Sequence, residues 1–300
     1  MSRGITVIGR GLIGHEVRGR GEVARSPEGL PWNDLDALAL RFRHLVGELD
    51  ERPSPQTVVW TAGRSVIASS EEECRQEVVA FRSLLDALAM SRGPERHTVV
   101  LASSIGGLFA GSPTGVVIDE RTEARPTSAY GRAKLLQEEL LRDLCARTGL
   151  RSVLARIATA YGPRQDRNKP QGLVSALIAA LRDRRPLRIF VPLDTRRSFL
   201  WAEDVGLILA WLATNDPPEA GDARVRMVAG NRSVSLIELL AIVHRVTGRR
   251  PPVLIGRSPE GRFHATHLDV RPGWRLPVRL TPLEVGVARC WSSSVSRSVA

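Results

Sequence analysis

A short apolar run near the start of the chain leads directly into three closely spaced glycines. Residues 5–8 (ITVI) have the composition of a buried strand, and Gly9, Gly11 and Gly14 follow at the spacing G-x-G-x-x-G. Such glycines allow a tight turn, close approach of the backbone to a diphosphate, and close packing of a following helix. The motif alone is weak. Its place after a strand predicts a dinucleotide-binding loop that opens a helix, rather than a plain glycine-rich turn.

Strand and helix patterns then alternate along the first half of the chain. Such alternation is typical of a parallel sheet covered by helices on both faces. We therefore expect an α/β fold, a Rossmann-type doubly wound parallel sheet with a smaller C-terminal substrate-binding domain. The expected strands are 5–8, 22–25, 57–62, 98–104 and 152–157, and the expected helices are 35–49, capped by Asn33 or Asp34, 71–90 and 128–147.

The pattern changes after Gly162 and Pro163. We assign residues 1–165 to an NAD(P)-binding Rossmann domain and residues 166–300 mainly to a substrate-binding domain, some segments of which return to the first. The serine-rich end after Trp291 is expected to fray. In this half the expected helices are 172–182, 202–214 and 235–247, and the expected strand is 187–191.

Composition narrows the classes of function. The formal net charge is +11, but the arginines are scattered and mixed with acids, which argues against nucleic-acid binding. No apolar run approaches the roughly 18–20 residues that span a bilayer, so we expect no membrane association. The three cysteines lack metal-ligand spacing and indicate reduced thiols in a cytoplasmic protein. His264 and His267 have no third ligand beside them, and no metal site is predicted.

Tyr130 and Lys134 form a Tyr-x-x-x-Lys pair within an expected helix. Residues four apart lie on one face of a helix, so the phenol and the ammonium can share a site. A neighbouring ammonium favours the phenolate, which lowers the pKa of the tyrosine and suits it to proton transfer. Lys134 and Lys169 are the only lysines in this arginine-rich chain.

The segment between the glycine-rich loop and the next helix is compressed. A dinucleotide site usually has an acid about 20 residues beyond the loop, where it binds the ribose 2′-hydroxyl. Here Gly19 and Gly21 interrupt the segment, and Arg25 stands where an acid would favour NAD. Together with Arg10 in the loop itself, this indicates NAD(P)(H) as cofactor with a weak preference for NADP.

The glycine-rich loop, two serines at the end of a strand (Ser103 and Ser104) and the Tyr-x-x-x-Lys pair follow one another in this order. In this the chain resembles the extended short-chain dehydrogenases/reductases. The resemblance is closest to the NAD-dependent epimerase/dehydratases that act on nucleotide sugars, and it runs from Ile5 to about Pro282. The stretches that carry it are 128–134 (SAYGRAK), 156–165 (RIATAYGPRQ), 171–174 (QGLV) and 196–204 (RRSFLWAED).

The resemblance implies a role for each matching residue. Tyr130 would be the acid/base, Lys134 would lower its pKa and hold the nicotinamide ribose, and Ser104, with Ser103 as the alternative, would orient the reacting oxygen. Arg197 would meet a substrate phosphate. The implied cofactor-binding residues are Gly9, Arg10, Gly11, Leu12, Ile13, Gly14, Arg25, Asp34, Ala62, Gly63, Tyr130 and Lys134, and the substrate-binding residues are Ser104, Tyr130, Thr159 and Arg197.

Three departures from the family pattern refine the expected reaction. Ile105 and Gly106 stand where sugar dehydratases carry Asp-Glu, which argues against dehydration. Ile105 also falls where Ser or Thr is common in the simplest alignment, and Thr159 replaces a common Asn. We expect a nucleotide-sugar 4-ketoreductase with Tyr130 as proton donor. The alternatives are a 4-epimerase or a cofactor-impaired binding module. A homodimer is possible through helices 71–90 and 128–147.

Overall fold

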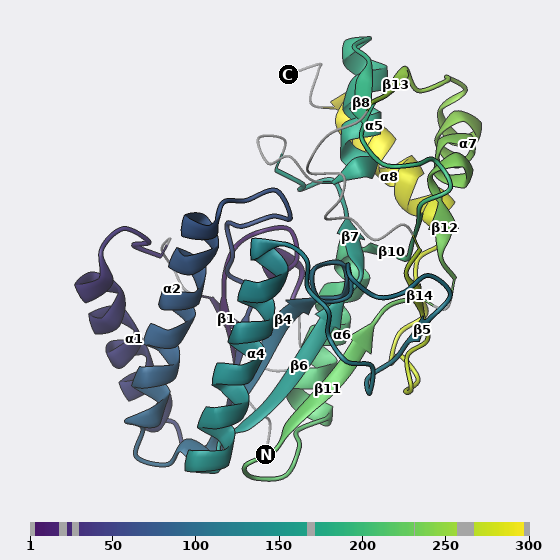
Figure 1. The fold of residues 1–300 in the computed structure, drawn as a ribbon. Helices are drawn as coiled ribbons and strands as arrows, with labels where there is room; N and C mark the ends of the chain where they lie inside the picture. Colours follow the sequence, from purple (N-terminus) through teal and green to yellow (C-terminus); the bar gives the residue numbers. More distant parts are fainter. Residues whose placement is uncertain are drawn as a thin grey trace.

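The computed structural model describes residues 4–17, 23–25, 30–166, 172–230, 232–256 and 267–296. Its centre is a six-stranded parallel sheet with the strand order β11-β6-β4-β3-β1-β2 (Figure 1). This confirms the predicted doubly wound α/β fold. The strands are β1 (Gly4–Ile8), β2 (Val23–Arg25), β3 (Gln56–Trp60), β4 (Thr98–Ser104), β6 (Arg151–Ile157) and β11 (Ala223–Val228).

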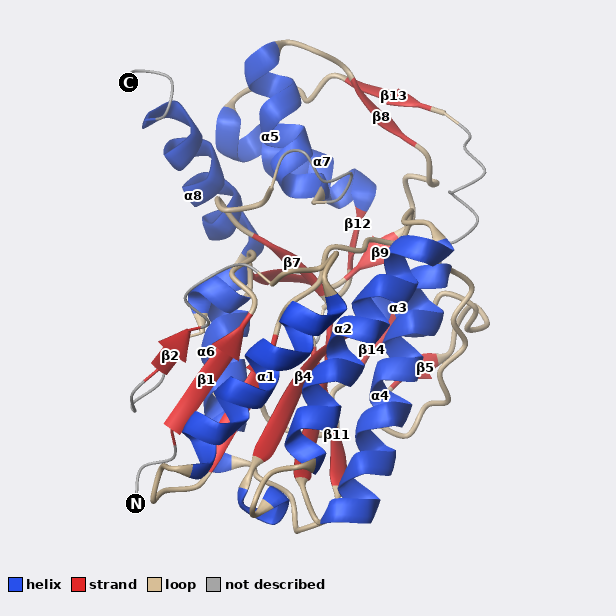
Figure 2. Ribbon diagram, turned by 90° about the vertical axis from the view of Figure 1, so that its left-hand side faces the viewer, coloured by secondary structure: helices blue, strands red, loops and turns tan. Residues whose placement is uncertain are grey.

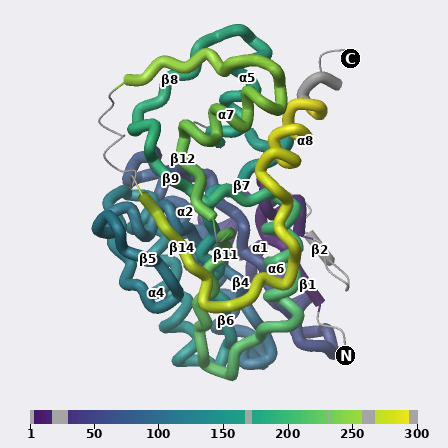
Figure 3. Tube along the Cα trace, turned by 90° about the vertical axis from the view of Figure 1, so that its right-hand side faces the viewer, coloured from purple at the N-terminus to yellow at the C-terminus, as the bar shows by residue number. Residues whose placement is uncertain are grey.

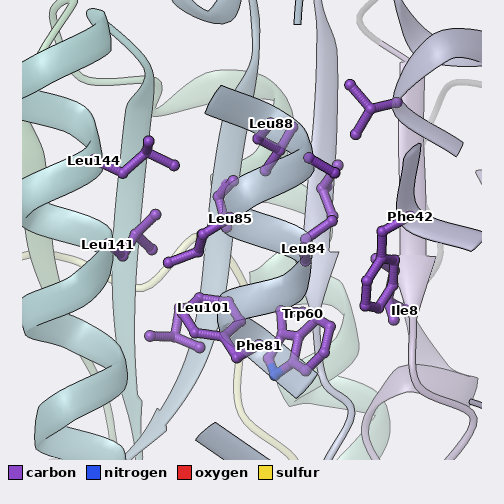
Figure 4. Close-up of a cluster of buried hydrophobic side chains, with 14 of the residues drawn as sticks. Ile8, Phe42, Trp60, Phe81, Leu84, Leu85, Leu88, Leu101, Leu141 and Leu144 are labelled. Carbon is purple, nitrogen blue, oxygen red and sulfur yellow. The ribbon is translucent and has the colours of Figure 1, made fainter. Parts of the chain in front are cut away.

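Helices cover both faces of this sheet because its inner strands are apolar on both sides. On one face lie α1 (Leu35–Asp50), α2 (Glu71–Ala89) and α4 (Ala129–Thr148), which stand in front of the strands in Figure 2. The core beneath them includes Trp60, Phe81 and Leu141, all fully buried (Figure 4). The opposite face is covered by α6 (Ala202–Asn215), which packs Val205, Ile208 and Leu212 on β1, β3, β4 and β6.

Each long helix of the first face begins at a polar cap that the sequence supplies. Asp34 accepts a hydrogen bond from the backbone N–H of Ala37 at the start of α1. Ser70 and Glu73 form a reciprocal capping box on α2, and the Ser128 hydroxyl accepts the N–H of Gly131 on α4. Each cap satisfies backbone donors that a helix start leaves unpaired, which is worth about 1 kcal/mol. These caps fix where the helices begin, and so fix Tyr130 in the first turn of α4.

The C-terminal elements form a smaller layer at the carboxyl end of the sheet (Figures 1 and 3). Its core joins Tyr161, Trp201, Leu177, Leu239 and Val287 from five different elements. The layer consists of α5 (Leu173–Asp183), α7 (Leu236–Thr247), α8 (Leu283–Ser296), and the parallel pair β8 (Leu187–Ile189) and β13 (Val253–Ile255). Short pairs connect it to the sheet: β7 (Thr159–Tyr161) with β10 (Phe199–Trp201), β9 (Arg196–Arg197) with β12 (Val234–Ser235), and β5 (Val117–Ile118) with β14 (Asp269–Val270).

One expectation for the C-terminal part was wrong, and one strand was not predicted. Strand β11, the sixth strand of the sheet, has no counterpart among the expected strands, although its arginines alternate with apolar residues as in a half-buried strand. The segment after Trp291 was expected to fray, yet α8 continues through Ser296; residues 297–300 lie outside the described part of the chain. Packing of Val287 and Cys290 against the apolar layer stabilises a helix that its serine-rich sequence does not favour.

The segment after Gly14 also differs from the helix that the sequence predicts. The described residues contain only a three-residue 3₁₀ turn, η1 (Gly14–Glu16), which ends as Val17 becomes extended. Helix α6 packs against this turn so closely that a Cβ on Gly206 would lie 2.3 Å from the carbonyl oxygen of Glu16. Among the described residues, no helix is long and apolar enough to cross a membrane.

The contact between α6 and η1 predicts opposite effects for the same substitution at two helical glycines. Gly206→Ala forces the glycine-rich loop away from α6 and lowers the free energy of unfolding by about 1–3 kcal/mol. Gly47→Ala in α1 meets nothing within 4 Å and raises it by about 0.5–1 kcal/mol, because alanine restricts the unfolded chain. Urea denaturation of both variants measures the difference. Equal effects would contradict the close packing at Gly206.

Candidate active site

The functional residues predicted from sequence gather where the parallel strands end. Strands β1, β3, β4 and β6 run in register and in one direction, so the segments that follow them meet at a single edge of the sheet (Figure 1). These segments are the loop 9–14 after β1, Ala62 and Gly63 after β3, Ser104 at the end of β4, and Thr159 after β6. Ligands of open α/β sheets bind at this edge.

Close contacts require two of the three glycines in the loop after β1, and the third stands in open space. Gly9 has φ of 110°, and a Cβ there would lie 2.4 Å from the backbone nitrogen of Ala62. Gly14 is buried against Gly9 and Thr61, whereas Gly11 is exposed and a Cβ there would meet nothing. Gly9 and Gly14 therefore fold the loop onto β3, and the backbone at Gly11 is left open to a ligand. Beside them, Leu12 and Ile13 are partly buried and Arg10 is exposed.

The side of the sheet beyond β1 is small. Among the described residues, only β2 lies there. It ends at Arg25, whose backbone pairs with Val7 and whose side chain lies outside the described part of the chain. Asp34, expected near an adenine, is exposed and caps α1. Residues 18–22 and 26–29 of the compressed segment lie outside the described part of the chain, and the structure gives Asp34 a local role as the cap of α1.

Tyr130 lies in the first turn of α4, against the short helix α3 (Ile105–Leu108). A Cβ on Gly107 would come within 2.9 Å of its ring, and a Cβ on Gly131 would lie 2.2 Å from the carbonyl oxygen of Gly107. The absence of side chains at Gly107 and Gly131 lets the two helices approach until the phenol ring rests on α3. Tyr130 remains partly exposed, as a proton-transfer group must be.

The Lys134 ammonium lies 5.6 Å from the centre of the Tyr130 ring, which agrees with the predicted pairing on one helix face. Its nearest partner is a residue that the sequence analysis missed. Lys134 Nζ donates to Glu77 Oε1 of α2 at 2.6 Å, and both side chains are buried. A sequence signal for Glu77 does exist, since this acid stands on the apolar face of α2 together with Cys74, Val78 and Phe81.

The two strand-end serines have separate tasks. Ser103 is buried and donates to Glu138 Oε1 at 2.7 Å, while Arg156 donates to both oxygens of the same carboxylate. Ser104 is partly exposed, and its hydroxyl accepts the backbone N–H of Gly107 at the start of α3. Ile105 points into a separate apolar cluster with Leu108 and Phe109. Of the two serines, only Ser104 has a hydroxyl available to a ligand.

Arg197 is the described cation best suited to a phosphate. Its guanidinium donates to the carbonyl of Arg196, no described acid is seen to pair with it, and burial lowers its pKa to about 10. Asp204, the acid that ends the stretch 196–204, accepts the backbone N–H and the hydroxyl of Thr281. Thr159 is partly buried, and its backbone N–H donates to Ser198. A guanidinium held without a counter-charge favours an anionic ligand.

The residues of the glycine-rich loop fit the diphosphate part of a dinucleotide. Gly11 leaves room for the backbone to approach, and Gly9 and Gly14 set the loop against β3. The three-residue turn after the loop supplies little helix dipole, and Lys134 already donates to Glu77. These two groups therefore contribute little to binding of the diphosphate. The backbone at Gly9, Gly11 and Gly14 would hold it, with Ala62 and Gly63 beside it. Among the residues that the structure describes, no group of His, Cys, Asp or Glu could hold a metal ion.

A family model described as "NAD dependent epimerase/dehydratase family" matches residues 14–225, more than half of the chain. The chain belongs to this family. The prediction of an extended short-chain dehydrogenase/reductase of the nucleotide-sugar type is thereby confirmed. The match begins at Gly14, so that β1 and most of its loop lie outside the matched stretch.

Family relatives and solved structures agree with this assignment. A dTDP-L-rhamnose 4-epimerase of Burkholderia thailandensis is 26% identical over 181 residues, 57% of this chain and 49% of that protein. A dTDP-4-dehydro-6-deoxyglucose reductase of Escherichia coli is 22% identical over 219 residues, 70% of this chain and 65% of that protein. Other matching relatives are named UDP-glucose 4-epimerases. The matches cover between 41% and 65% of the length of these curated relatives.

Among solved structures, MoeE5 in complex with UDP-glucose and NAD superposes with a TM-score of 0.76. It is 26% identical, and the match covers 99% of both chains. The described fold of this chain, including its C-terminal layer, thus has a counterpart in a solved structure.

The contact between α3 and Tyr130 predicts a contrast between neighbouring glycines. Gly107→Ala displaces the Tyr130 ring and lowers the free energy of unfolding by about 1–3 kcal/mol. Gly106→Ala, one residue earlier in the same helix, meets nothing within 4 Å and leaves stability unchanged or slightly raised. Chemical denaturation followed by tryptophan fluorescence measures both. A Gly107→Ala variant as stable as Gly106→Ala would show that the ring does not rest on α3.

Proposed function

We propose that this protein is a nucleotide-sugar 4-epimerase in which Tyr130 carries the proton of the C4 hydroxyl. The observation that carries the proposal is the partly exposed Tyr130 beside Lys134, at the sheet edge that also carries the glycine-rich loop and Ser104. NAD, when bound, supplies the hydride chemistry, as in other dehydrogenase-type enzymes. The protein contributes position and proton transfer.

Each residue of the site has a stated role in this proposal. Tyr130 accepts the proton of the C4 hydroxyl and returns it after the configuration at C4 has inverted. Ser104 orients the same oxygen, and Arg197 binds the diphosphate of the sugar nucleotide. We propose further that residues 1–165 hold the cofactor and that residues 166–300 mainly hold the sugar nucleotide. Two elements of the second part return to the first domain: β11 is a strand of its sheet, and α6 packs on that sheet.

The sequence analysis favoured 4-ketoreduction, and the comparisons support its alternative, epimerisation, better. Most of the relatives named above are 4-epimerases, although the reductase of Escherichia coli also matches. One observation keeps 4-ketoreduction as the second candidate. The single short strand beyond β1 offers little surface to an adenosine, which suits a cofactor that exchanges at each turnover. The proposed NADP preference rests on Arg10 and Arg25 alone, whereas the solved relative MoeE5 was crystallised with NAD.

The reaction is tested with UDP-glucose, UDP-N-acetylglucosamine and UDP-glucuronic acid in the presence of NAD⁺. Epimerisation converts each accepted sugar to its C4 epimer with no net change in nicotinamide absorbance, which proton NMR detects at H4. Reduction instead consumes NADH or NADPH in the presence of a 4-keto sugar nucleotide. Failure in both arms, with folded protein and bound cofactor, would overturn the proposal.

Tyr130→Phe is expected to lower kcat by at least about a hundredfold, because general acid–base catalysis contributes on the order of 10²–10⁴. The variant retains the ring that rests on Gly107 and should bind NAD with unchanged affinity. Turnover and nucleotide fluorescence titration measure the two effects. Substantial remaining turnover in Tyr130→Phe would contradict the assigned role.

Arg197→Met is expected to weaken binding of UDP by about ten- to a hundredfold, the loss typical of a charge-assisted hydrogen bond. Arg188→Met, on the exposed side of β8, removes the same charge from the C-terminal layer and should leave UDP affinity unchanged. Isothermal titration calorimetry compares the two variants. Equal losses would assign the effect to overall charge rather than to contact with the diphosphate.

A further inference from the structure

Two neighbouring loops of the C-terminal layer, with the strand that follows one of them, carry a group of exposed arginines. The loop between α5 and β8 lies beside the loop between α7 and β13, and the backbone N–H of Leu187 donates to the carbonyl of Pro252 between them. Both loops lie at the end of this layer far from the central sheet (Figure 2). We call the arginines of this group the basic tip; they are Arg184, Arg185, Arg188, Arg249 and Arg250.

The positive charge of the basic tip is not balanced by nearby acids. Asp183 is the one acid in residues 182–190, and residues 244–256 contain none. Within the described part of the chain, no arginine of the tip forms an ion pair, and the Arg249 guanidinium lies 5.7 Å from the ring centre of Trp291. Five like charges on adjacent segments repel one another in the free protein. An anionic partner would therefore be attracted to this end of the molecule.

The ends of the two helices explain only part of this arrangement. A cation next to a helix C-terminus interacts favourably with the helix dipole, which accounts for Arg184 after α5 and Arg249 after α7. Arg188 lies in β8 and Arg250 lies two residues beyond the cap Gly248, outside the last helical turns. In addition, Arg184 has φ of 51°, a left-handed conformation that favours glycine. Local structure therefore does not select an arginine at each of these positions.

Two apolar side chains beside the basic tip are exposed to solvent. Leu254 and Ile255 of β13 are 50% and 64% exposed, and neither belongs to the core of the C-terminal layer. Leu254 pairs in register with Arg188 of β8, so the leucine and the arginine lie next to each other on one face of this pair of strands. A surface that combines cations with exposed aliphatic side chains matches the boundary of an anionic lipid bilayer, which offers phosphates above an apolar interior.

We propose that the basic tip, together with Leu254 and Ile255, docks this protein on the surface of an anionic membrane. The arginines bind lipid phosphates, and the two aliphatic side chains enter the boundary between headgroups and acyl chains. From the lack of a spanning segment we expected no membrane association, but a peripheral contact of this kind needs no such segment. A nucleic acid would engage the arginines through its phosphates and would leave the aliphatic pair unused. The contact is independent of the proposed epimerase reaction.

Co-sedimentation of the full chain with lipid vesicles tests this docking surface. We expect binding to vesicles made of phosphatidylglycerol and phosphatidylcholine in equal parts, and little binding to phosphatidylcholine alone. Binding should weaken between about 0.05 M and about 0.5 M salt, because salt screens the charges of the arginines and the lipids. The double variant Arg188→Gln with Arg250→Gln should lose about 25-fold in affinity, at about fivefold for each arginine near an anionic surface. Leu254→Ser should lose about five- to tenfold, because a half-exposed leucine no longer enters the lipid.

Arg43→Gln with Arg275→Gln is the matched control, because it removes the same charge from exposed positions in α1 and in the segment before α8. This control should bind the anionic vesicles like the unaltered protein. Equal binding to both kinds of vesicle, or equal losses in the two double variants, overturns the proposal.

A duplex DNA oligonucleotide distinguishes a lipid surface from a general polyanion site. The lipid assignment is wrong if Leu254→Ser leaves vesicle binding unchanged while Arg188→Gln with Arg250→Gln weakens binding of the duplex and of vesicles alike. Near-ultraviolet circular dichroism verifies that each variant is folded; the substituted side chains are exposed, so we expect no change. Vesicle binding by a protein without epimerase or reductase activity would retain this inference and reject the proposed function.

Discussion

The position of α4, the helix that carries Tyr130 and Lys134, depends on a buried carboxylate. Glu138 has no exposed surface, and its oxygens accept from Arg156 of β6 and Ser103 of β4, with Arg142 at the helix surface. A buried acid of this kind is tolerated only when its charge and hydrogen bonds are satisfied. Here they are satisfied by two strands at once. This fixes how far α4 lies along the sheet, and thereby places Tyr130 and Lys134 above the strand ends.

A second buried carboxylate, Glu77, acts on the same helix from its other side. Glu138 ties α4 down to the sheet, and Glu77 ties it across to α2 and to the loop after β3. Between these two anchors, the glycines at 107 and 131 bring α3 into contact with the phenol ring. The site is thus assembled mainly on rigid elements. The glycine-rich loop is held in turn by α6, whose Gly206 rests on the backbone of Glu16.

The sequence predicted most of the sheet because its signals are local. Strand β4 matches the predicted range, and α1, α2 and α4 begin beside the polar caps that their sequences offer. Predictions were wrong where tertiary packing overrides local preference. Strand β11 is defined by its pairing with β6 rather than by a strong apolar run, and α8 exists because its apolar face packs against α5 and α7. Of the helix expected after Gly14, the described residues show a single 3₁₀ turn, which packs against α6 at Gly206 and ends as Val17 becomes extended.

By itself, the sequence determined the family and the order of the main strands and helices between residues 35 and 157. It also determined the proximity of Tyr130 to Lys134, because an interval of four residues places two side chains on one helix face. It could not determine the partner of Lys134. Glu77 lies 57 residues away in the chain, and only the packing of α2 against α4 brings its carboxylate to the ammonium. The tertiary structure likewise separated the two serines, since the pleat of β4 turns Ser103 toward Glu138 and leaves Ser104 at the open edge. Charge balance around the phenol depends on such long-range contacts, and no local pattern records them.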